Sequence, residues 1–355
     1  MSRRCLKCGS VSEGEARFCP KHGSPLVEAA PAATTAPAAP SGSATMVRKP
    51  PAPGPSAAER AASLSNQMLD SRYEVLKKLG EGGMSYVYEA KEIGSTESVA
   101  IKVLSPKLGA DKTSVERLRR EAGLAMRLTH PNCCRILRMG ETEDGLIYLV
   151  MPYLKGELLS DREVRLGPIA PELGMVWLAE ICAGLHQAHQ LNIVHRDLKP
   201  ENIMLVPGPD GYEHAVVMDF GLAKENRNEP GVAKLTATGI ILGTPEFMSP
   251  EQIRGKALDA RSDIYALGIV AFEMFTQKLP FQGRNAQEMM IARLRGQPVP
   301  VRQYKPDFPP KLEKALMRSL DANPDNRYTT ALEFGIAMAE ALGPGYYEKV
   351  RDVLQ

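Results

Sequence analysis

The chain lacks any long apolar stretch. Nowhere do about 18 apolar residues follow one another, which is the length that a membrane-spanning helix needs. The start, Met1-Ser2-Arg3-Arg4-Cys5, leads into no apolar core of the kind found in a secretory signal peptide. These absences predict a soluble protein that has no membrane span and stays in the cytoplasm.

An excess of charge of one sign is also missing. The 355 residues include 44 Lys and Arg against 42 Asp and Glu, which gives a formal net charge of +2. No overall field therefore attracts the protein to nucleic acid or to a membrane surface, and any basic site must be local. With 43% hydrophobic residues, a chain of this length can bury a substantial core in one large or two ordinary domains.

Cysteine is scarce, and its distribution is uneven. Of the six cysteines, one group lies near the N-terminus and the other lies among apolar neighbours further on; they are Cys5, Cys8 and Cys19, and Cys133, Cys134 and Cys182. In a cytosolic protein the first group suggests a metal site and the second suggests buried thiols.

The N-terminal cysteines have the spacing of zinc ligands. Cys5 and Cys8 form one pair, Cys19 and His22 form a second, and a glycine follows each pair. Such turns let backbone amides face thiolate sulfurs while four side chains converge on one ion. The spacing resembles a short zinc ribbon and predicts a Cys₃His Zn²⁺ site within residues 1–27, which would fold only with metal. The alternative is a metal-free arm with incidental cysteines.

The composition then changes over residues 28–70. Ala, Pro, Ser and Thr dominate the first part of this stretch, which cannot pack a core and is expected to form a semi-extended linker. Residues 56–69 can be read either as a short helix that leads into the next domain or as disordered.

The most informative stretch is Val-His-Arg-Asp-Leu-Lys-Pro-Glu-Asn at residues 194–202, with Asp-Phe-Gly following at 219–221. Phosphoryl transfer needs an acceptor beside the attacking hydroxyl, a cation near the travelling phosphoryl group and oxygen ligands for Mg²⁺. Asp197, Lys199, Asn202 and Asp219 supply these parts in that order. Either motif alone would be weak evidence, because each also occurs as an ordinary turn.

Together with further motifs at compatible spacing, this stretch resembles the bacterial, Hanks-type branch of the serine/threonine protein kinases, from about Tyr73 to Leu342. The resemblance implies an α+β, bilobal kinase fold over residues 71–343. A β-rich N-lobe with one key helix would cover 71–151, and a larger, mainly helical C-lobe would cover 155–343. Residues 344–355 would form a short tail. ATP and Mg²⁺ (or Mn²⁺) would be the cofactors.

The N-lobe is expected to begin with a glycine-rich hairpin. Strands over 73–79 and 86–90 flank the turn from Gly80 to Ser85, where glycine lets the backbone close over phosphates. A β-branched strand over 99–103 places Lys102 inward, and a buried ammonium needs a partner. That partner is expected to be Glu121, on an amphipathic helix over 114–128, although Glu121 can also be read as a surface carboxylate among arginines.

By resemblance, the adenine site lies beside a strand over 146–151. Met151 would be the gatekeeper, and the carbonyl of Pro152 and the amide of Leu154 would pair with adenine. Proline keeps the carbonyl that this role requires. The full expected nucleotide site comprises Leu79, Gly80, Gly82, Ser85, Val87, Ala100, Lys102, Met151, Pro152, Leu154, Met204 and Met218.

The C-lobe is expected to be held together by buried charges. Asp263 would begin a buried helix and accept backbone amides of the catalytic loop, and Glu251 would pair with Arg327. Helices are expected from Pro171 to His189, over 312–320 and over 331–342. His186 and His189 are interpreted as packing residues rather than as a metal pair, because no third ligand accompanies them.

The segment after Asp219 carries candidate regulatory residues. Arg196 could hold a phosphothreonine, so Thr236 or Thr238 is expected to be autophosphorylated, the alternative being two solvated threonines. Thr244 would close the site by bonding to Asp197 and Lys199.

The predicted activity is transfer of the γ-phosphoryl group of MgATP to Ser or Thr hydroxyls of proteins, in bacterial signalling. Asp197 would accept the hydroxyl proton, Lys199 and Lys102 would offset phosphate charge, and Asn202 and Asp219 would hold the metals. A pseudokinase scaffold and a small-molecule phosphotransferase are the competing classes. Expected partners are protein substrates, a second kinase copy that pairs through the ATP lobe, and an unknown partner of the zinc-ribbon-like segment.

Overall fold

The computed structural model describes residues 2–5, 11–13, 26–28, 56–82, 85–105, 112–220 and 245–354. The chain divides into two compact units, Met1–Pro53 and Gly54–Gln355. In the first unit, β1 (Ser2–Cys5) is the central strand of a three-stranded antiparallel sheet, between β2 (Val11–Glu13) and β3 (Leu26–Glu28). Cys5 therefore ends a strand, whereas Cys8, Cys19 and His22 lie outside the described residues.

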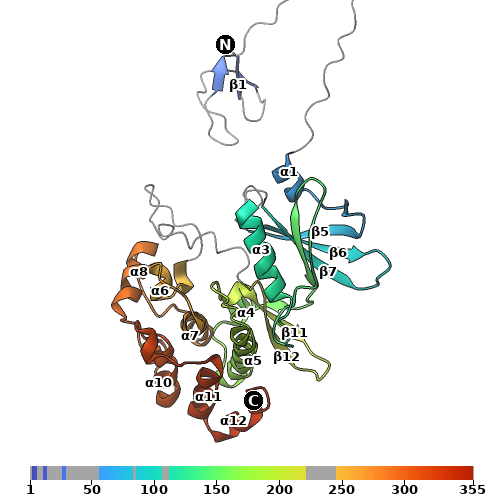
Figure 1. Cartoon of the computed structure of the whole chain (residues 1–355). Coiled ribbons are helices and arrows are strands. Elements are labelled where there is room, and N and C mark those ends of the chain that lie inside the picture. The colour runs from blue at the N-terminus through green and yellow to red at the C-terminus, as the bar shows by residue number, and fades with distance from the viewer. Residues whose placement is uncertain are drawn as a thin grey trace, which may run out of the picture. The chain divides into compact units, whose positions relative to one another are not determined.

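The N-lobe of the second unit is a six-stranded antiparallel sheet in the order β4-β5-β6-β7-β9-β8. Its strands are β4 (Met68–Leu69), β5 (Tyr73–Gly82), β6 (Ser85–Glu92), β7 (Ser98–Leu104), β9 (Ile147–Pro152) and β8 (Arg138–Glu141). Tyr88, Ile101 and Val150 are among the apolar side chains buried on one face. Leu118 of α3 (Lys112–Ala125) packs on Leu104 and Ile147, so this helix lies against the sheet (Figure 1). These elements confirm the strands and the helix that the sequence predicts.

A short N-terminal extension belongs to this lobe. Helix α1 (Ala57–Ala62) begins with a capping box between Ser56 and Glu59, which satisfies backbone amides at the helix start. Ala61, Leu64 and Leu69 are buried against the sheet. The hydroxyl of Tyr88 donates to the Ala61 carbonyl at 2.8 Å. The linker was expected to extend to residue 70, but apolar residues after Ser56 join the core. Its expected C-terminal boundary is therefore wrong.

The C-lobe is mainly helical. Its helices are α4 (Leu159–Leu166), α5 (Pro171–Gln190), α6 (Pro250–Ile253), α7 (Ala260–Thr276), α8 (Ala286–Arg295), α9 (Val301–Tyr304), α10 (Pro310–Ser319), α11 (Ala331–Leu342) and α12 (Pro344–Val350). Short 3₁₀ turns η1 (Pro200–Asn202), η3 (Pro245–Phe247) and η4 (Pro324–Asn326) accompany them, with a small sheet of β10 (Glu157–Leu158), β11 (Ile203–Pro207) and β12 (Glu213–Val217). The helices predicted from Pro171, over 312–320 and over 331–342 are confirmed.

Helix α7 is the centre of this lobe because it is apolar on all sides. From Ser262 to Thr276 nearly every residue is buried, as expected for a helix that other helices surround (Figure 1). The C-terminal residues also join the core: Val350 is 2% exposed and Leu354 is 3% exposed. The expectation of a separate tail over 344–355 is therefore wrong, since α12 packs on the domain. None of the described helices is long and apolar enough to cross a bilayer.

Candidate active site

Asp263 of α7 anchors the catalytic loop. Its carboxylate accepts the backbone N–H groups of His195 at 2.7 Å and Arg196 at 2.9 Å, and it pairs with Nε2 of His189 at 2.8 Å. Burial raises the pKa of Asp263, but the hydrogen bonds and the neighbouring histidines outweigh burial and hold that pKa below its ordinary value. The role predicted for Asp263 is confirmed.

Two non-glycine residues of the site have left-handed backbone. The φ angle is 66° at Arg196 and 57° at Asp219, a region that L-residues seldom adopt. The Arg196 amide is held by Asp263, and its carbonyl accepts from the Gln252 side chain at 2.8 Å. Conformations of this kind persist where surrounding contacts enforce them, and they concentrate at functional sites.

His195 connects the catalytic loop to the segment that carries Asp219. Its ring is fully buried, and Nε2 lies 2.7 Å from the Met218 carbonyl. Nδ1 accepts the backbone N–H of Asp197 at 3.3 Å. Because Nδ1 accepts, the proton must lie on Nε2, which donates to Met218. His195 therefore fixes the backbone beside both Asp197 and Asp219.

The β11–β12 hairpin brings the candidate metal ligands together. Ile203 pairs with Val217, so the preceding Asn202 lies opposite Met218, whose N–H donates to the Asn202 carbonyl at 2.8 Å. The side-chain amide of Asn202 donates to the Asp197 carbonyl at 2.7 Å. Its donor group is thus turned to the catalytic loop, and the oxygen of the same amide is the atom that could ligate a metal. A carboxylate and an amide oxygen are hard donors that suit Mg²⁺.

Lys102 of the N-lobe reaches the candidate metal ligand Asp219. Its Nζ lies 2.8 Å from Oδ1 of Asp219, and its side chain is 16% exposed. Burial raises the pKa of Asp219, but the charge of Lys102 and its hydrogen bond more than offset burial, so that pKa lies below its ordinary value. Lys199 Nζ is 4.0 Å from Oδ2 of Asp197. The pairing of Lys102 with Glu121 stays a prediction.

The expected nucleotide residues lie on a small number of elements. Leu79, Gly80 and Gly82 belong to β5, and Ser85 and Val87 belong to β6, which together form a hairpin. Ala100 and Lys102 belong to β7, Met151 and Pro152 end β9, and Leu154 follows it. Met204 lies on β11 and Met218 follows β12. Several of the apolar side chains are partly exposed, which leaves apolar surface for a planar ring. Thr236, Thr238 and Thr244 lie outside the described residues.

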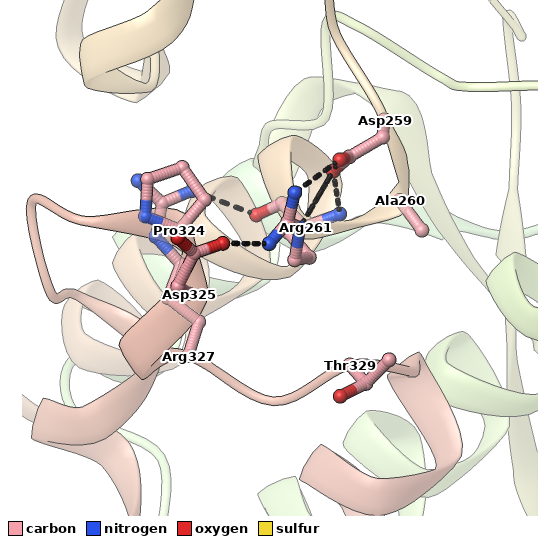
Figure 2. A pocket seen from close by; sticks show the side chains of 7 residues that line it. All are labelled: Asp259, Ala260, Arg261, Pro324, Asp325, Arg327 and Thr329. Carbon is pink, nitrogen blue, oxygen red and sulfur yellow. Dashed lines mark hydrogen bonds and ion pairs between the residues drawn. The ribbon is translucent and has the colours of Figure 1, made fainter.

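A separate pocket of about 330 Å³ lies between the start of α7 and η4 (Figure 2). Arg261 bridges Asp259 and Asp325 across it, at 2.7 and 2.6 Å. Arg327, which also lines the pocket, forms a two-pronged pair with Glu251 at distances of 2.8 and 2.9 Å. This pair was predicted and is confirmed. The Arg327–Glu251 pair holds α6 to the lobe, and the charges that line the pocket are paired with one another.

Sequence reasoning missed two features near the site. Arg293 of α8 is fully buried and donates to the carbonyls of Pro245 and Glu246. Glu163 is 5% exposed, and Glu273 of α7 is partly buried. Glu273 had a visible signal, because it is the lone charge in the apolar run from Ile264 to Phe275.

Comparison with known proteins adds the family. The protein kinase domain model matches residues 73–339. The serine/threonine-protein kinase pkn3 of Myxococcus xanthus is 37% identical over 265 residues, covering 74% of this chain and 48% of that protein. PknB of Mycolicibacterium smegmatis is 40% identical over 271 residues, covering 75% and 42%. The chain thus spans less than half the length of these curated relatives.

A solved structure agrees with this match. The kinase domain of Mycobacterium tuberculosis PknI superposes with a TM-score of 0.62 at 26% identity, covering 79% of this chain and 100% of that one. A structure of Rad53 in complex with AMP-PNP has a TM-score of 0.62 at 22% identity, covering 74% of this chain and 64% of that one. At this identity the likeness supports the fold alone. The β-sheet N-lobe, the helical C-lobe and the family match lead to one conclusion: the chain belongs to the protein kinase family.

Proposed function

We propose that the chain is a serine/threonine protein kinase that transfers the γ-phosphoryl group of ATP to hydroxyl groups of proteins. The observation that carries the proposal is the convergence of Asp197, Asn202, Asp219 and Lys102 through the contacts described above. The relatives named serine/threonine-protein kinase, in two bacterial species, support the acceptor class.

Each residue has a role that its position permits. Asp197 orients the attacking hydroxyl and accepts its proton, and Lys199 beside it offsets phosphate charge. Asn202 and Asp219 would hold Mg²⁺, which supplies charge neutralisation at the phosphates when bound. Lys102 orders Asp219 and offers its ammonium to phosphate oxygens. Catalysis would thus rest on positioning and electrostatics.

The test is phosphate transfer from labelled ATP with Mg²⁺ to a protein or peptide, comparing the unaltered chain with Asp197→Asn. We expect transfer by the unaltered chain and a loss of about a hundredfold or more in the variant. Nucleotide binding without transfer by the unaltered chain would instead favour a pseudokinase scaffold.

We further propose regulation through Thr236 or Thr238, supported by the sequence between Asp219 and Glu251 and by the position of Arg196 beside Asp197. Mass spectrometry of the labelled chain identifies the modified residue. Unchanged activity in the double variant Thr236→Ala, Thr238→Ala would place regulation elsewhere.

For the first unit we propose a Zn²⁺ site formed by Cys5, Cys8, Cys19 and His22, and a partner that is not yet identified. For the protein as a whole we propose a cytoplasmic location, and for the kinase domain we propose pairing with a second copy. Ligand spacing and the place of Cys5 at the end of β1 support the zinc site. One Zn²⁺ per chain by elemental analysis, lost in Cys5→Ser with Cys8→Ser, is the expected result. Unchanged zinc content would contradict it.

A further inference from the structure

A histidine of the C-lobe, outside the candidate active site, lies between two carboxylates. Nδ1 of His214 on β12 is 2.6 Å from Oε1 of Glu180 on α5, and its Nε2 is 3.0 and 3.1 Å from the two oxygens of Asp210. Glu180 is 3% exposed, whereas Asp210 lies on the exposed turn between β11 and β12. We call these three residues the histidine clasp, because they join the β11–β12 hairpin to α5.

The geometry of the clasp requires a proton at each ring nitrogen. An ionised carboxylate only accepts hydrogen bonds, so each contact needs an N–H, and only the imidazolium has both. The hydrogen bonds to Glu180 and Asp210 raise the pKa of His214 above its ordinary value of 6.5, although burial opposes them. Burial raises the pKa of Glu180, which favours a proton on the short His214–Glu180 hydrogen bond. His214 therefore keeps its charge to a higher pH than an ordinary histidine does.

The two carboxylates of the clasp are the main charged groups that act on the His214 ring within the described part of the chain. Across the hairpin His214 is opposite Val206 of β11, which carries no charge. The preceding residue, Glu213, is bound by Arg162 of α4 at 2.6 and 2.7 Å. The ring also fills the space beside Gly208, where a Cβ atom would lie 2.4 Å from it. Loss of one proton would therefore leave two carboxylates facing one neutral ring.

The clasp is connected to the candidate active site through the backbone of β12. The second oxygen of Glu180 accepts the Ala215 N–H at 2.7 Å, so the carboxylate that binds His214 also holds the strand. The side chain of Asn132 donates to the Ala215 carbonyl at 2.9 Å, but an amide does not titrate. Of these two anchors of β12, only that of Glu180 changes with the proton on the histidine. The strand then leads to Asp219.

We propose that His214 is a positioning residue that, when protonated, fastens the β11–β12 hairpin to α5 and so holds Asp219 in place for nucleotide binding. Asn202 directly precedes β11 and Asp219 follows β12, so both candidate metal ligands lie at the same end of this hairpin. The inference rests on the proposed kinase function, which supplies the nucleotide. Because the pKa of His214 is raised on folding, the clasp is complete below pH 6.5 and is lost as the pH rises through the raised value.

The experiment measures the dissociation constant of MgATP by calorimetry, with the full chain and with His214→Gln, at pH 6 and at pH 9. We expect the unaltered chain to bind about three- to tenfold more tightly than the variant at pH 6, which is part of the contribution of one charge-assisted hydrogen bond, and equally at pH 9. Comparing the two proteins at each pH removes the titration of the nucleotide itself. His186→Gln, a partly exposed histidine of α5 that contacts Gln190, is the matched control and should bind as the unaltered chain does.

NMR of the histidine-labelled chain measures the proton directly. The resonance that is missing in His214→Gln should titrate with a pKa above 6.5 in the unaltered chain. Asp210→Asn, on the exposed turn, should lower both this pKa and the pH at which MgATP affinity declines, and it serves as the second variant should His214→Gln fail to fold.

Three outcomes distinguish the clasp from the proposed function. A ratio of dissociation constants that is the same at both pH values would overturn the positioning role and leave the kinase function intact. A pKa of His214 at or below 6.5 would do the same. If the unaltered chain bound no MgATP at either pH, the proposed function itself would fall, and this role of His214 with it.

Discussion

Lys102 of the N-lobe and Asp219 of the C-lobe are joined by an ion pair of 2.8 Å. The two residues come from β7 and from the end of the β11–β12 hairpin, so the pair connects the two lobes at the centre of the site. Lys102 also holds the pKa of Asp219 low despite burial, which keeps a carboxylate ready for a cation.

Replacing this lysine should therefore affect chemistry more than folding. We expect Lys102→Met to reduce phosphate transfer by about a hundredfold or more, because an oriented charge at the phosphates is lost. The measurement is kcat/KM for a peptide, alongside the melting temperature. Lys91→Met, an exposed lysine on the adjacent strand β6, should leave transfer unchanged. Equal activity of the two variants would remove Lys102 from the mechanism.

The Asp263 anchor predicts a stability effect with a defined pH dependence. Asp263→Asn loses a charged acceptor of two backbone amides, and we expect the free energy of unfolding to fall by about 3 kcal/mol at pH 7. The folded-state pKa of Asp263 is depressed, so its contribution is present above its unfolded pKa of about 3.9 and is lost as the pH falls. Urea unfolding at pH 7 and at a series of pH values below 3.9 should show the difference shrinking as the pH falls, and Asp307→Asn, on the surface, should show none.

The raised pKa of Glu163 predicts a pH dependence of stability with the opposite sign to that of Asp263. Its folded-state pKa of about 8 lies above its ordinary value of 4.5, so between these values the folded state retains a proton that the unfolded state has lost. Stability should therefore fall as the pH rises through this range. Glu163→Gln stays neutral, so its melting temperature should exceed that of the unaltered chain by a few degrees at pH 8 and match it near pH 4. An equal difference at both pH values would show that Glu163 does not titrate in this range.

The sequence predicted the features that local spacing determines. The catalytic loop, the hairpin of residues 73–90 and the helices of the C-lobe follow from local patterns, whereas the Glu251–Arg327 pair, 76 positions apart, was expected only from the family resemblance. The packing of α1 and α12 was not predictable, because each helix is short and its buried apolar residues, such as Ala61 and Val350, carry no periodic signal. Contacts of this kind depend on the folded neighbour, which local pattern does not encode.

The same limit explains why the proximity of Glu163 and Glu273 was missed. Glu163 and Glu273 are 110 positions apart in the numbering, and only the folded lobe brings their charges together. A lone carboxylate in an apolar helix, as at Glu273, signals an unusual environment but does not identify its neighbours.

Arg293 shows what such a long-range contact can do for function. It reaches from α8 to the carbonyls of Pro245 and Glu246, directly after Thr244, and its guanidinium lies over the ring of Phe281. No hydroxyl or aliphatic replacement supplies two donors in that geometry. We therefore expect Arg293→Met to shift η3, which follows directly on Thr244, the residue predicted to close the site over Asp197 and Lys199.

The expected result for Arg293→Met is about a tenfold or greater loss of kcat/KM for a protein or peptide substrate, with the affinity for ATP unchanged, because the nucleotide residues lie on other elements. Arg295→Met is the matched control, since Arg295 is exposed on the same helix two positions away, and it should retain full activity. A general loss of stability would weaken nucleotide binding and substrate use alike. If ATP affinity and kcat/KM declined in parallel, in protein that still melts cooperatively, Arg293 would have no role specific to the segment before η3.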